Sequence, residues 1–97
     1  MAKNPRIESL KNEIDQIKNH MEMRKKTIAS LKSDKAKIAD RYKGQIARAD
    51  KKDKEKLRDR KKHEIDNLAK QTLTLKRAIE DYKKQILRKR DEMKKLK

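Results

Sequence analysis

Apolar residues recur every seven positions in two long runs, and this spacing constrains the fold more than any other feature of the sequence. A seven-residue repeat with apolar residues at its first and fourth positions, called a and d, buries one stripe of a helix against another helix. In the first run the apolar a and d positions hold Ile7, Leu10, Ile14, Ile17, Met21, Ile28, Leu31, Ile38 and Tyr42. In the second run the corresponding residues are Ile65, Leu68, Thr72, Leu75, Ile79, Tyr82, Ile86, Met93 and Leu96. The pattern predicts an all-α protein built from coiled-coil helices.

The segment between the two runs, Ala49 to Lys62, has only one large apolar side chain, Leu57. The a positions of the second run are two residues out of phase with those of the first, and the slip falls inside this segment. A phase slip where nothing can be buried favours a turn. We therefore predict a long antiparallel helical hairpin in one coiled-coil unit over 1–97, with a first helix over 5–48, a tip over 49–54 and a second helix over 55–96.

The expected helix ends have capping residues, but the turn lacks the usual turn residues. Asn4 followed by Pro5 is a favourable helix start, and Asp50 or Asp53 is able to cap the second helix. However, no Gly or Pro lies within 45–64, and the only glycine, Gly44, comes before the expected tip. The alternative is therefore one continuous helix in a parallel coiled-coil dimer.

The expected core is thin, because 49% of the 97 residues are charged and only 32% are hydrophobic. Small chains bury a low fraction of their surface and commonly need association to compensate. We expect the chain to form homo-oligomers, as a four-helix bundle or a larger array. The apolar residues expected off the stripe, and therefore at this self-association surface, are Met23, Leu73 and Leu87.

The net charge of +16, from 32 basic and 16 acidic residues, favours a polyanionic partner. Nucleic acid, either DNA or RNA, is the expected partner, bound through phosphates with little sequence specificity. The segment between the runs supplies Lys51, Lys52, Lys54, Lys56, Arg58, Arg60, Lys61 and Lys62. Basic residues also recur along one edge of the predicted hairpin, at Lys11, Lys18, Lys25, Lys32, Lys76, Lys83, Lys84, Arg88 and Arg90.

These features suggest an architectural, packaging or ribonucleoprotein component. The alternative is a coiled-coil scaffold, stalk or adaptor whose basic tip contacts an acidic protein surface. The only two aromatic residues, Tyr42 and Tyr82, fall on the apolar stripe, so we expect them to pack in the core and not to stack on bases.

Other classes of function find no support in the sequence. There is no cysteine, no phosphate-binding glycine loop and no ligand or nucleophile motif, so we expect no enzyme activity, no cofactor and no metal site. No apolar run suits a signal peptide or a membrane span, and we expect no membrane partner. The expected location is intracellular, in the cytoplasm or nucleoid, or inside a virion.

Overall fold

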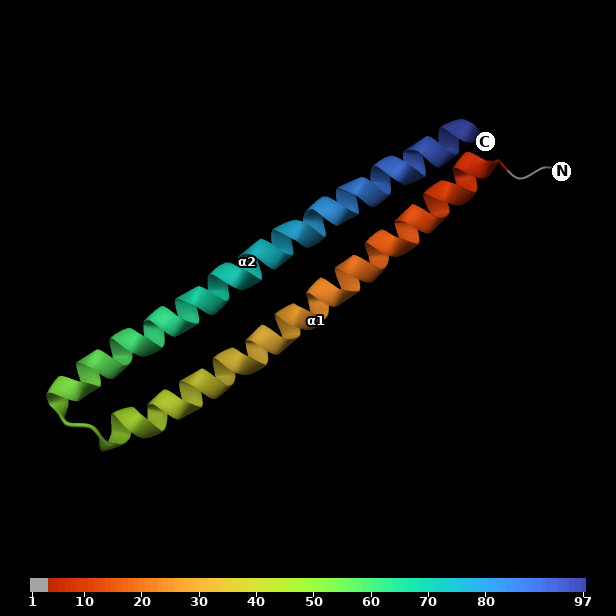
Figure 1. Ribbon diagram of the computed structural model, residues 1–97. Helices are drawn as coiled ribbons and strands as arrows, with labels where there is room; N and C mark the ends of the chain where they lie inside the picture. The colour runs from red at the N-terminus through yellow and green to blue at the C-terminus, as the bar shows by residue number, and fades with distance from the viewer. Residues whose placement is uncertain (1–3) are drawn as a thin grey trace. The chain divides into compact units, whose positions relative to one another are not determined.

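Two long α-helices make up the part of the chain that the structure, a computed structural model, describes, which is residues 4–97. Helix α1 spans Pro5–Arg48 and helix α2 spans Lys51–Leu96 (Figure 1). Within residues 4–97 there is no strand. The predicted fold class, an all-α helical hairpin, is confirmed.

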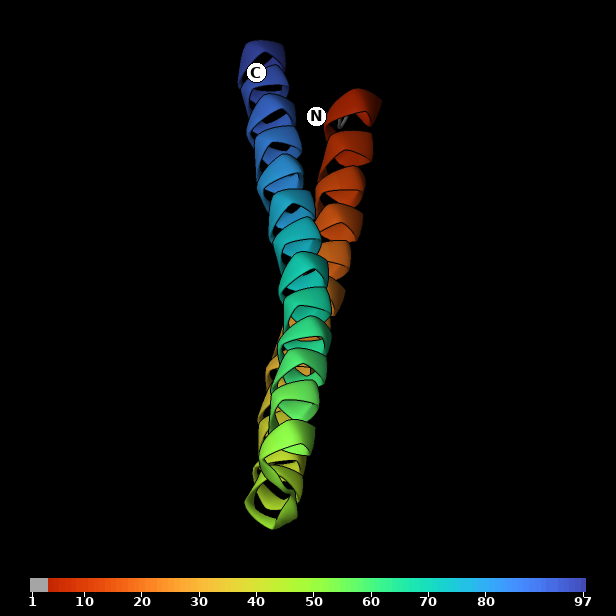
Figure 2. The same cartoon turned by 90° about the vertical axis from the view of Figure 1, so that its left-hand side faces the viewer.

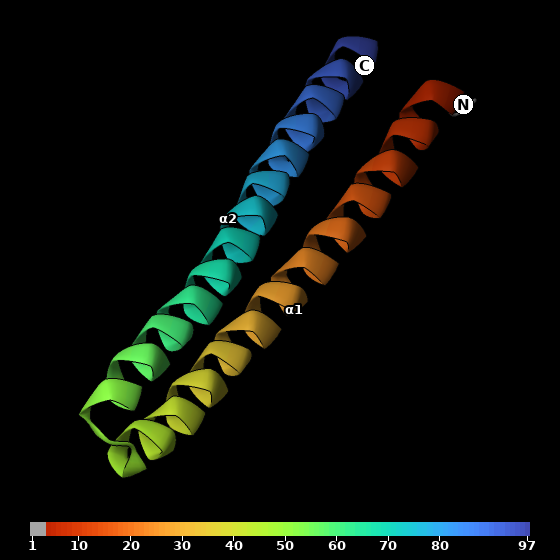
Figure 3. The same ribbon diagram turned by 60° about the vertical axis from the view of Figure 1, so that its left-hand side comes forward.

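Contacts divide the chain into two compact units, each of which pairs a segment of α1 with a segment of α2. Unit 1 comprises Met1–Lys26 and Leu75–Lys97, of which residues 1–3 lie outside the described part, and unit 2 comprises Thr27–Thr74. In unit 1 the first half of α1 and the second half of α2 lie side by side (Figure 3). Unit 2 contains the remaining halves of both helices and the connection between them (Figure 2).

The start of α1 is capped by Asn4. The Asn4 Oδ1 atom accepts a hydrogen bond from the backbone amide of Arg6 at 2.9 Å, and the Asn4 carbonyl accepts one from the amide of Glu8 at 3.2 Å. Pro5 has no amide to leave unpaired, and Glu8 places an acidic side chain at the positive end of the helix. The helix start that Asn4 and Pro5 predict is therefore present in the structure.

The turn between the helices is shorter than predicted, because only Ala49 and Asp50 lie outside the two helices. Asp50 caps α2: its Oδ1 atom accepts a hydrogen bond from the amide of Asp53 at 3.0 Å, and its carbonyl accepts one from the amide of Lys54 at 2.9 Å. With these amides satisfied, α2 begins at Lys51, and residues 51–54 form its first turn. The predicted start of the second helix at residue 55 is wrong for this reason. No described residue has a positive φ, so this turn does not depend on glycine.

The core consists of the predicted apolar stripe. In unit 1 the buried side chains of α1 are those of Leu10, Ile14, Ile17 and Met21, and those of α2 are Ile79 and Ile86. In unit 2 the side chains of Leu31 and Tyr42 are buried. All eight residues occupy predicted a or d positions. The periodicity therefore identified the packed face of both helices.

The packed face shifts within unit 2, near the turn. Gln45 lies seven residues after Ile38 and so falls at a d position, yet it is exposed, and its neighbour Ile46 is half-buried instead. On α2, Leu57 is half-buried although it lies outside the predicted stripe. Near the turn the packed face therefore departs from the predicted stripe.

Gly44 gives a first testable prediction, because it lies within α1 and is exposed. A Cβ atom added at Gly44 would meet no atom within 4 Å. We expect Gly44→Ala to raise the free energy of unfolding by about 1 kcal/mol, because alanine loses less backbone entropy in a helix. Thermal unfolding followed by circular dichroism measures this. Ala36→Gly, at an exposed site in the interior of the same helix, is the matched control and should lower stability by a similar amount. An unchanged or lower melting temperature for Gly44→Ala would show that residue 44 is not in a regular helix.

Candidate nucleic-acid interface

The densest positive charge in the described chain lies at the start of α2. We use the name tip cluster for its eight basic residues, Lys51, Lys52, Lys54, Lys56, Arg58, Arg60, Lys61 and Lys62. Six of them are exposed, whereas Lys54 and Lys61 are half-buried. The same twelve-residue segment contains only three acids, Asp53, Glu55 and Asp59. The tip cluster therefore presents a large excess of positive charge to solvent.

No residue of the tip cluster forms an ion pair with any side chain among residues 4–97. Lys51, Lys52 and Lys54 also lie in the first turn of α2, where the helix dipole is positive and disfavours cations. Mutual repulsion among neighbouring cations adds to this cost. The tip cluster is thus an arrangement that a bound anion would stabilise.

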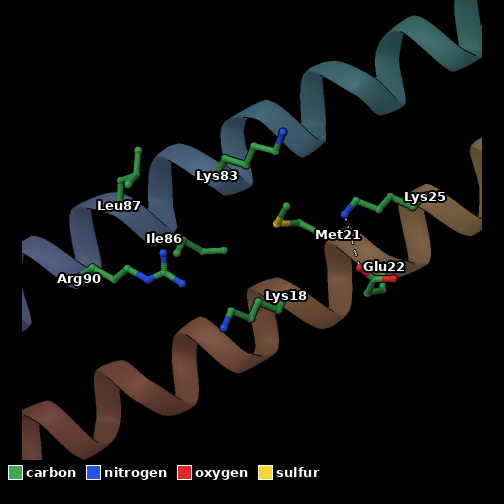
Figure 4. Close-up of a pocket in the computed structure, with 8 residues that line it drawn as sticks. All are labelled: Lys18, Met21, Glu22, Lys25, Lys83, Ile86, Leu87 and Arg90. Atoms are coloured by element: carbon green, nitrogen blue, oxygen red, sulfur yellow. Dashed lines mark ion pairs between the residues drawn. The ribbon is translucent and has the colours of Figure 1, made fainter.

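The predicted basic edge is partly assembled in unit 1. Lys18 and Lys25 of α1 and Lys83 and Arg90 of α2 line one shared groove (Figure 4). Lys11 lines an adjoining hollow together with Lys18 and Arg90. The structure therefore brings together five of the predicted edge residues from the two helices.

The remaining edge residues are exposed but do not line this groove. Lys76, Lys84 and Arg88 lie on α2 in unit 1, and Arg88 borders a separate shallow hollow with Glu92. Lys32 belongs to unit 2. These four residues are therefore not part of the assembled edge.

Several edge cations have an acidic neighbour one turn away on the same helix. The shortest such pair joins Lys83 Nζ to Glu80 Oε1 at 3.2 Å, and Lys25 Nζ lies 3.5 Å from Glu22 Oε1. Lys11 Nζ lies 3.9 Å from Glu8 Oε1. Exposed pairs of this kind contribute only about 0.2–0.5 kcal/mol each to stability. Their main effect is to reduce the local positive charge of the edge. No residue of the tip cluster forms an ion pair of this kind within residues 4–97.

The groove in unit 1 has an apolar floor as well as a basic rim. Its volume is about 580 Å³, and Met21, Ile86 and Leu87 make up its apolar lining, which we call the floor. Met21 and Ile86 point into the space between the two helices, whereas Leu87 points from α2 away from α1 (Figure 4). Leu87 is 60% exposed, whereas Met21 and Ile86 are buried in the core. The floor therefore continues the core of unit 1 out to the surface.

The three residues predicted for self-association do not form one surface. Leu87 lines the groove, whereas Met23 of the same unit, 59% exposed, does not. Leu73 is 50% exposed and belongs to unit 2. Whether any of them mediates association stays a prediction.

A cluster of ion pairs in unit 1 was not anticipated from the sequence. Lys89 Nζ donates a hydrogen bond to Glu13 Oε2 at 2.9 Å, and Arg6 forms an ion pair with Glu92 at 3.1 Å. Arg6 Nη1 also lies 4.0 Å from Glu13 Oε1. The available signal was Lys89, which lies seven residues after Tyr82 and seven before Leu96 and so falls at a d position, since such a side chain needs an acid on the facing helix. These cross-helix pairs connect α1 to α2 at the edge of the core.

The hydrogen bond from Lys89 holds the pKa of Glu13 below its ordinary value of 4.5. Desolvation opposes this shift, and the charges of Lys89 and Arg6 add to it. Because the pKa of Glu13 is lower in the folded state than in the unfolded state, ionised Glu13 stabilises the fold above about pH 4.5, and this contribution is lost as the pH falls through the folded-state pKa.

The second prediction is that Glu13→Gln lowers the melting temperature at pH 7 and that its difference from the wild type shrinks as the pH falls below about 4.5. Melting temperatures from pH 7 to 2.5 test this. Glu55→Gln removes an exposed acid that makes no ion pair with residues 4–97, and it is the matched control. A constant difference between Glu13→Gln and wild type across the pH range would contradict the role of the ionised Glu13.

Both tyrosines are engaged within the protein, as predicted. Tyr42 is buried, and the guanidinium of Arg41 lies 5.2 Å from its ring centroid. Arg41 Nη2 also pairs with Glu64 at 3.0 Å, and a hydrogen bond with Glu64 raises the pKa of Tyr42 above its ordinary value of 10.0. Tyr82 is half-buried and stacks on His20 at a centroid distance of 5.9 Å. Neither ring is free to stack on a base.

Within residues 4–97, no three His, Asp or Glu side chains gather in a way that would hold a metal ion. Neither described helix has a stretch long and apolar enough to cross a membrane.

The fold and its basic surfaces place this chain among charged helical hairpins. Comparison with known proteins does not assign it to a family. No known family model, no curated protein and no solved structure matches the sequence.

Proposed function

We propose that this chain binds nucleic acid through its phosphates, with the tip cluster as the main contact. The main support is that eight basic residues gather at the start of α2 and form no ion pair with any of residues 4–97. A phosphate backbone supplies the negative charge that the protein itself does not. The net charge of +16 attracts the polyanion over longer range.

The proposed binding has little sequence specificity. Reading bases requires side chains that reach base edges, or exposed aromatic rings on which bases stack. Tyr42 is buried and Tyr82 stacks on His20, and the tip cluster consists of Lys and Arg, whose usual contacts are phosphates. The assembled edge of unit 1 offers secondary phosphate contacts. This mode of binding suits an architectural, packaging or ribonucleoprotein role in the cytoplasm, in a nucleoid or inside a virion.

Binding to a 20-base-pair duplex and to a single strand of the same length, measured at several salt concentrations, tests this proposal. The logarithm of the association constant should fall linearly with the logarithm of salt concentration, with a slope near −0.9 for each phosphate contacted on the duplex. Randomising the sequence should change the affinity little. A flat salt response, or no binding at about 50 mM salt, would overturn the proposal. A one-to-one complex with an acidic protein that survives nuclease treatment and uses the tip cluster would favour the adaptor function instead.

Self-association belongs to the same proposal, because the thin core leaves apolar side chains such as Leu73 exposed. Joining hairpins would also place several tip clusters on one nucleic acid and raise the overall affinity by multivalency. Sedimentation equilibrium over a range of protein concentrations tests this. A chain that stays monomeric at all concentrations would exclude it.

A further inference from the structure

We infer that the groove of unit 1 docks an acidic amphipathic helix of another protein. This site is separate from the tip cluster, which belongs to unit 2, and the inference does not depend on nucleic-acid binding. It starts from the two kinds of surface in the groove, an apolar floor and a basic rim.

The apolar floor has no use in phosphate binding. Leu87 is 60% exposed, and the buried side chains of Met21 and Ile86 line the groove beside it. Phosphates and sugars gain little from contact with an aliphatic side chain, whereas an apolar side chain of a partner would remove Leu87 from water. The floor therefore favours a partner that has an apolar stripe of its own.

The basic rim follows the geometry of a helix. Lys18 and Lys25 are seven residues apart on α1, and Lys83 and Arg90 are seven residues apart on α2. Seven residues of helix correspond to about 10.5 Å along the axis. A third helix lying in the groove presents its own side chains at the same spacing. Acidic residues seven apart on both of its flanks would therefore face the two basic rows, while its apolar stripe covers Leu87.

Charge complementarity sets the chemistry of the partner. Glu22, which pairs with Lys25, is the one acid that lines the groove, against four basic residues. A second copy of this chain carries 32 basic and 16 acidic residues, so it would bring further positive charge to a basic rim. The occupant that satisfies both surfaces is an acidic amphipathic helix, with Leu or Ile on one face and Asp or Glu beside that face.

The test uses a defined probe, a fluorescently labelled 21-residue peptide with Leu at a and d and Glu at e and g of each heptad. Fluorescence anisotropy measures its affinity for the full chain, and a scrambled peptide of the same composition is the reference. We expect the amphipathic peptide to bind and the scrambled peptide to bind at least tenfold more weakly. Equal binding of the two peptides, or no binding of either, would overturn the inference.

Two exposed leucines make a matched pair of variants. Leu87→Gln removes the exposed part of the floor and should weaken peptide binding about tenfold. Leu73→Gln makes the same change at a similarly exposed site in unit 2 and should leave peptide binding unchanged. Circular dichroism confirms that both variants keep their helices. Equal affinities of Leu87→Gln and wild type would show that charge alone attracts the peptide and would overturn the inference.

Two further measurements separate this site from the other surfaces. Glutamine substitutions in the tip cluster should leave peptide binding unchanged, and Leu87→Gln should leave nucleic-acid binding unchanged. If Leu87→Gln weakens duplex binding as much as it weakens peptide binding, the groove belongs to nucleic acid. If the free chain forms a dimer that Leu87→Gln dissociates, a second copy occupies the groove. Either result would contradict the proposed partner.

Discussion

Neutralising half of the tip cluster should lower the affinity for duplex DNA at least 100-fold at about 50 mM salt. The variant carries Lys52→Gln, Lys56→Gln, Arg58→Gln and Lys62→Gln. All four side chains are exposed, and none pairs with an acid among residues 4–97. Each lost phosphate contact should also reduce the slope of log affinity against log salt by about one. The variant should therefore show both a weaker and a less salt-dependent interaction.

The fold should tolerate these four substitutions. Lys52 lies in the first turn of α2, where a cation is unfavourable, and exposed substitutions usually change stability by less than about 0.5 kcal/mol each. The matched control removes four exposed lysines outside the predicted interface, with Lys26→Gln, Lys37→Gln, Lys70→Gln and Lys95→Gln. It has the same net charge as the tip variant. Equal losses of affinity in the two variants would show that total charge, and not the tip cluster, determines binding.

Leu10→Ala should be the most destabilising single truncation in the core. Leu10 is fully buried, at 0% exposure, and it packs in unit 1. Replacing a buried leucine by alanine costs about 2–5 kcal/mol through lost burial and the cavity that remains. For a domain with a thin core this is a large share of the total stability, so the variant should unfold at a much lower denaturant concentration than the wild type.

Chemical unfolding followed by circular dichroism measures the effect of Leu10→Ala. Leu96→Ala makes the same chemical change in the same unit at a side chain that is 40% exposed, and it should cost well under 1 kcal/mol. If the two variants unfold at the same denaturant concentration, the predicted core of unit 1 would be wrong.

The packed face of the hairpin was predictable because it depends on a period that the sequence displays directly. Ile14, Met21, Ile79 and Ile86 all follow the seven-residue repeat, and all are buried. The start of α1 was also predictable, since Asn4 and Pro5 act through local hydrogen bonds and backbone geometry.

The start of α2 was not predicted correctly, because the choice between Asp50 and Asp53 as the cap depends on which free amides each side chain reaches. The structure selects Asp50, which adds one more turn of helix than expected. Lys54 shows the consequence: it was expected in the tip, but it lies half-buried in the first turn of α2.

The basic residues of the candidate sites were visible in the sequence, but their grouping was not. Lys18 and Arg90 are far apart in the chain, and their shared groove requires knowing how α1 meets α2 in unit 1. The apolar floor was missed for a similar reason: Leu87 was predicted as an exposed apolar residue, and only the structure places it beside Met21 and Ile86. The pairing of Lys89 with Glu13 likewise depends on side-chain reach across the helices.

The groove of unit 1 requires that one chain folds back on itself, and one distance measurement tests this hairpin most directly. The chain has no cysteine, so Asn12→Cys and Asp91→Cys give two unique, exposed label sites, both in unit 1. Spin-labelled protein diluted in an excess of unlabelled protein reports the distance within single chains. The hairpin predicts a label separation below about 30 Å, because the labels sit on two neighbouring helices. A separation on the order of 120 Å, the length of 79 residues of continuous helix, would contradict the hairpin.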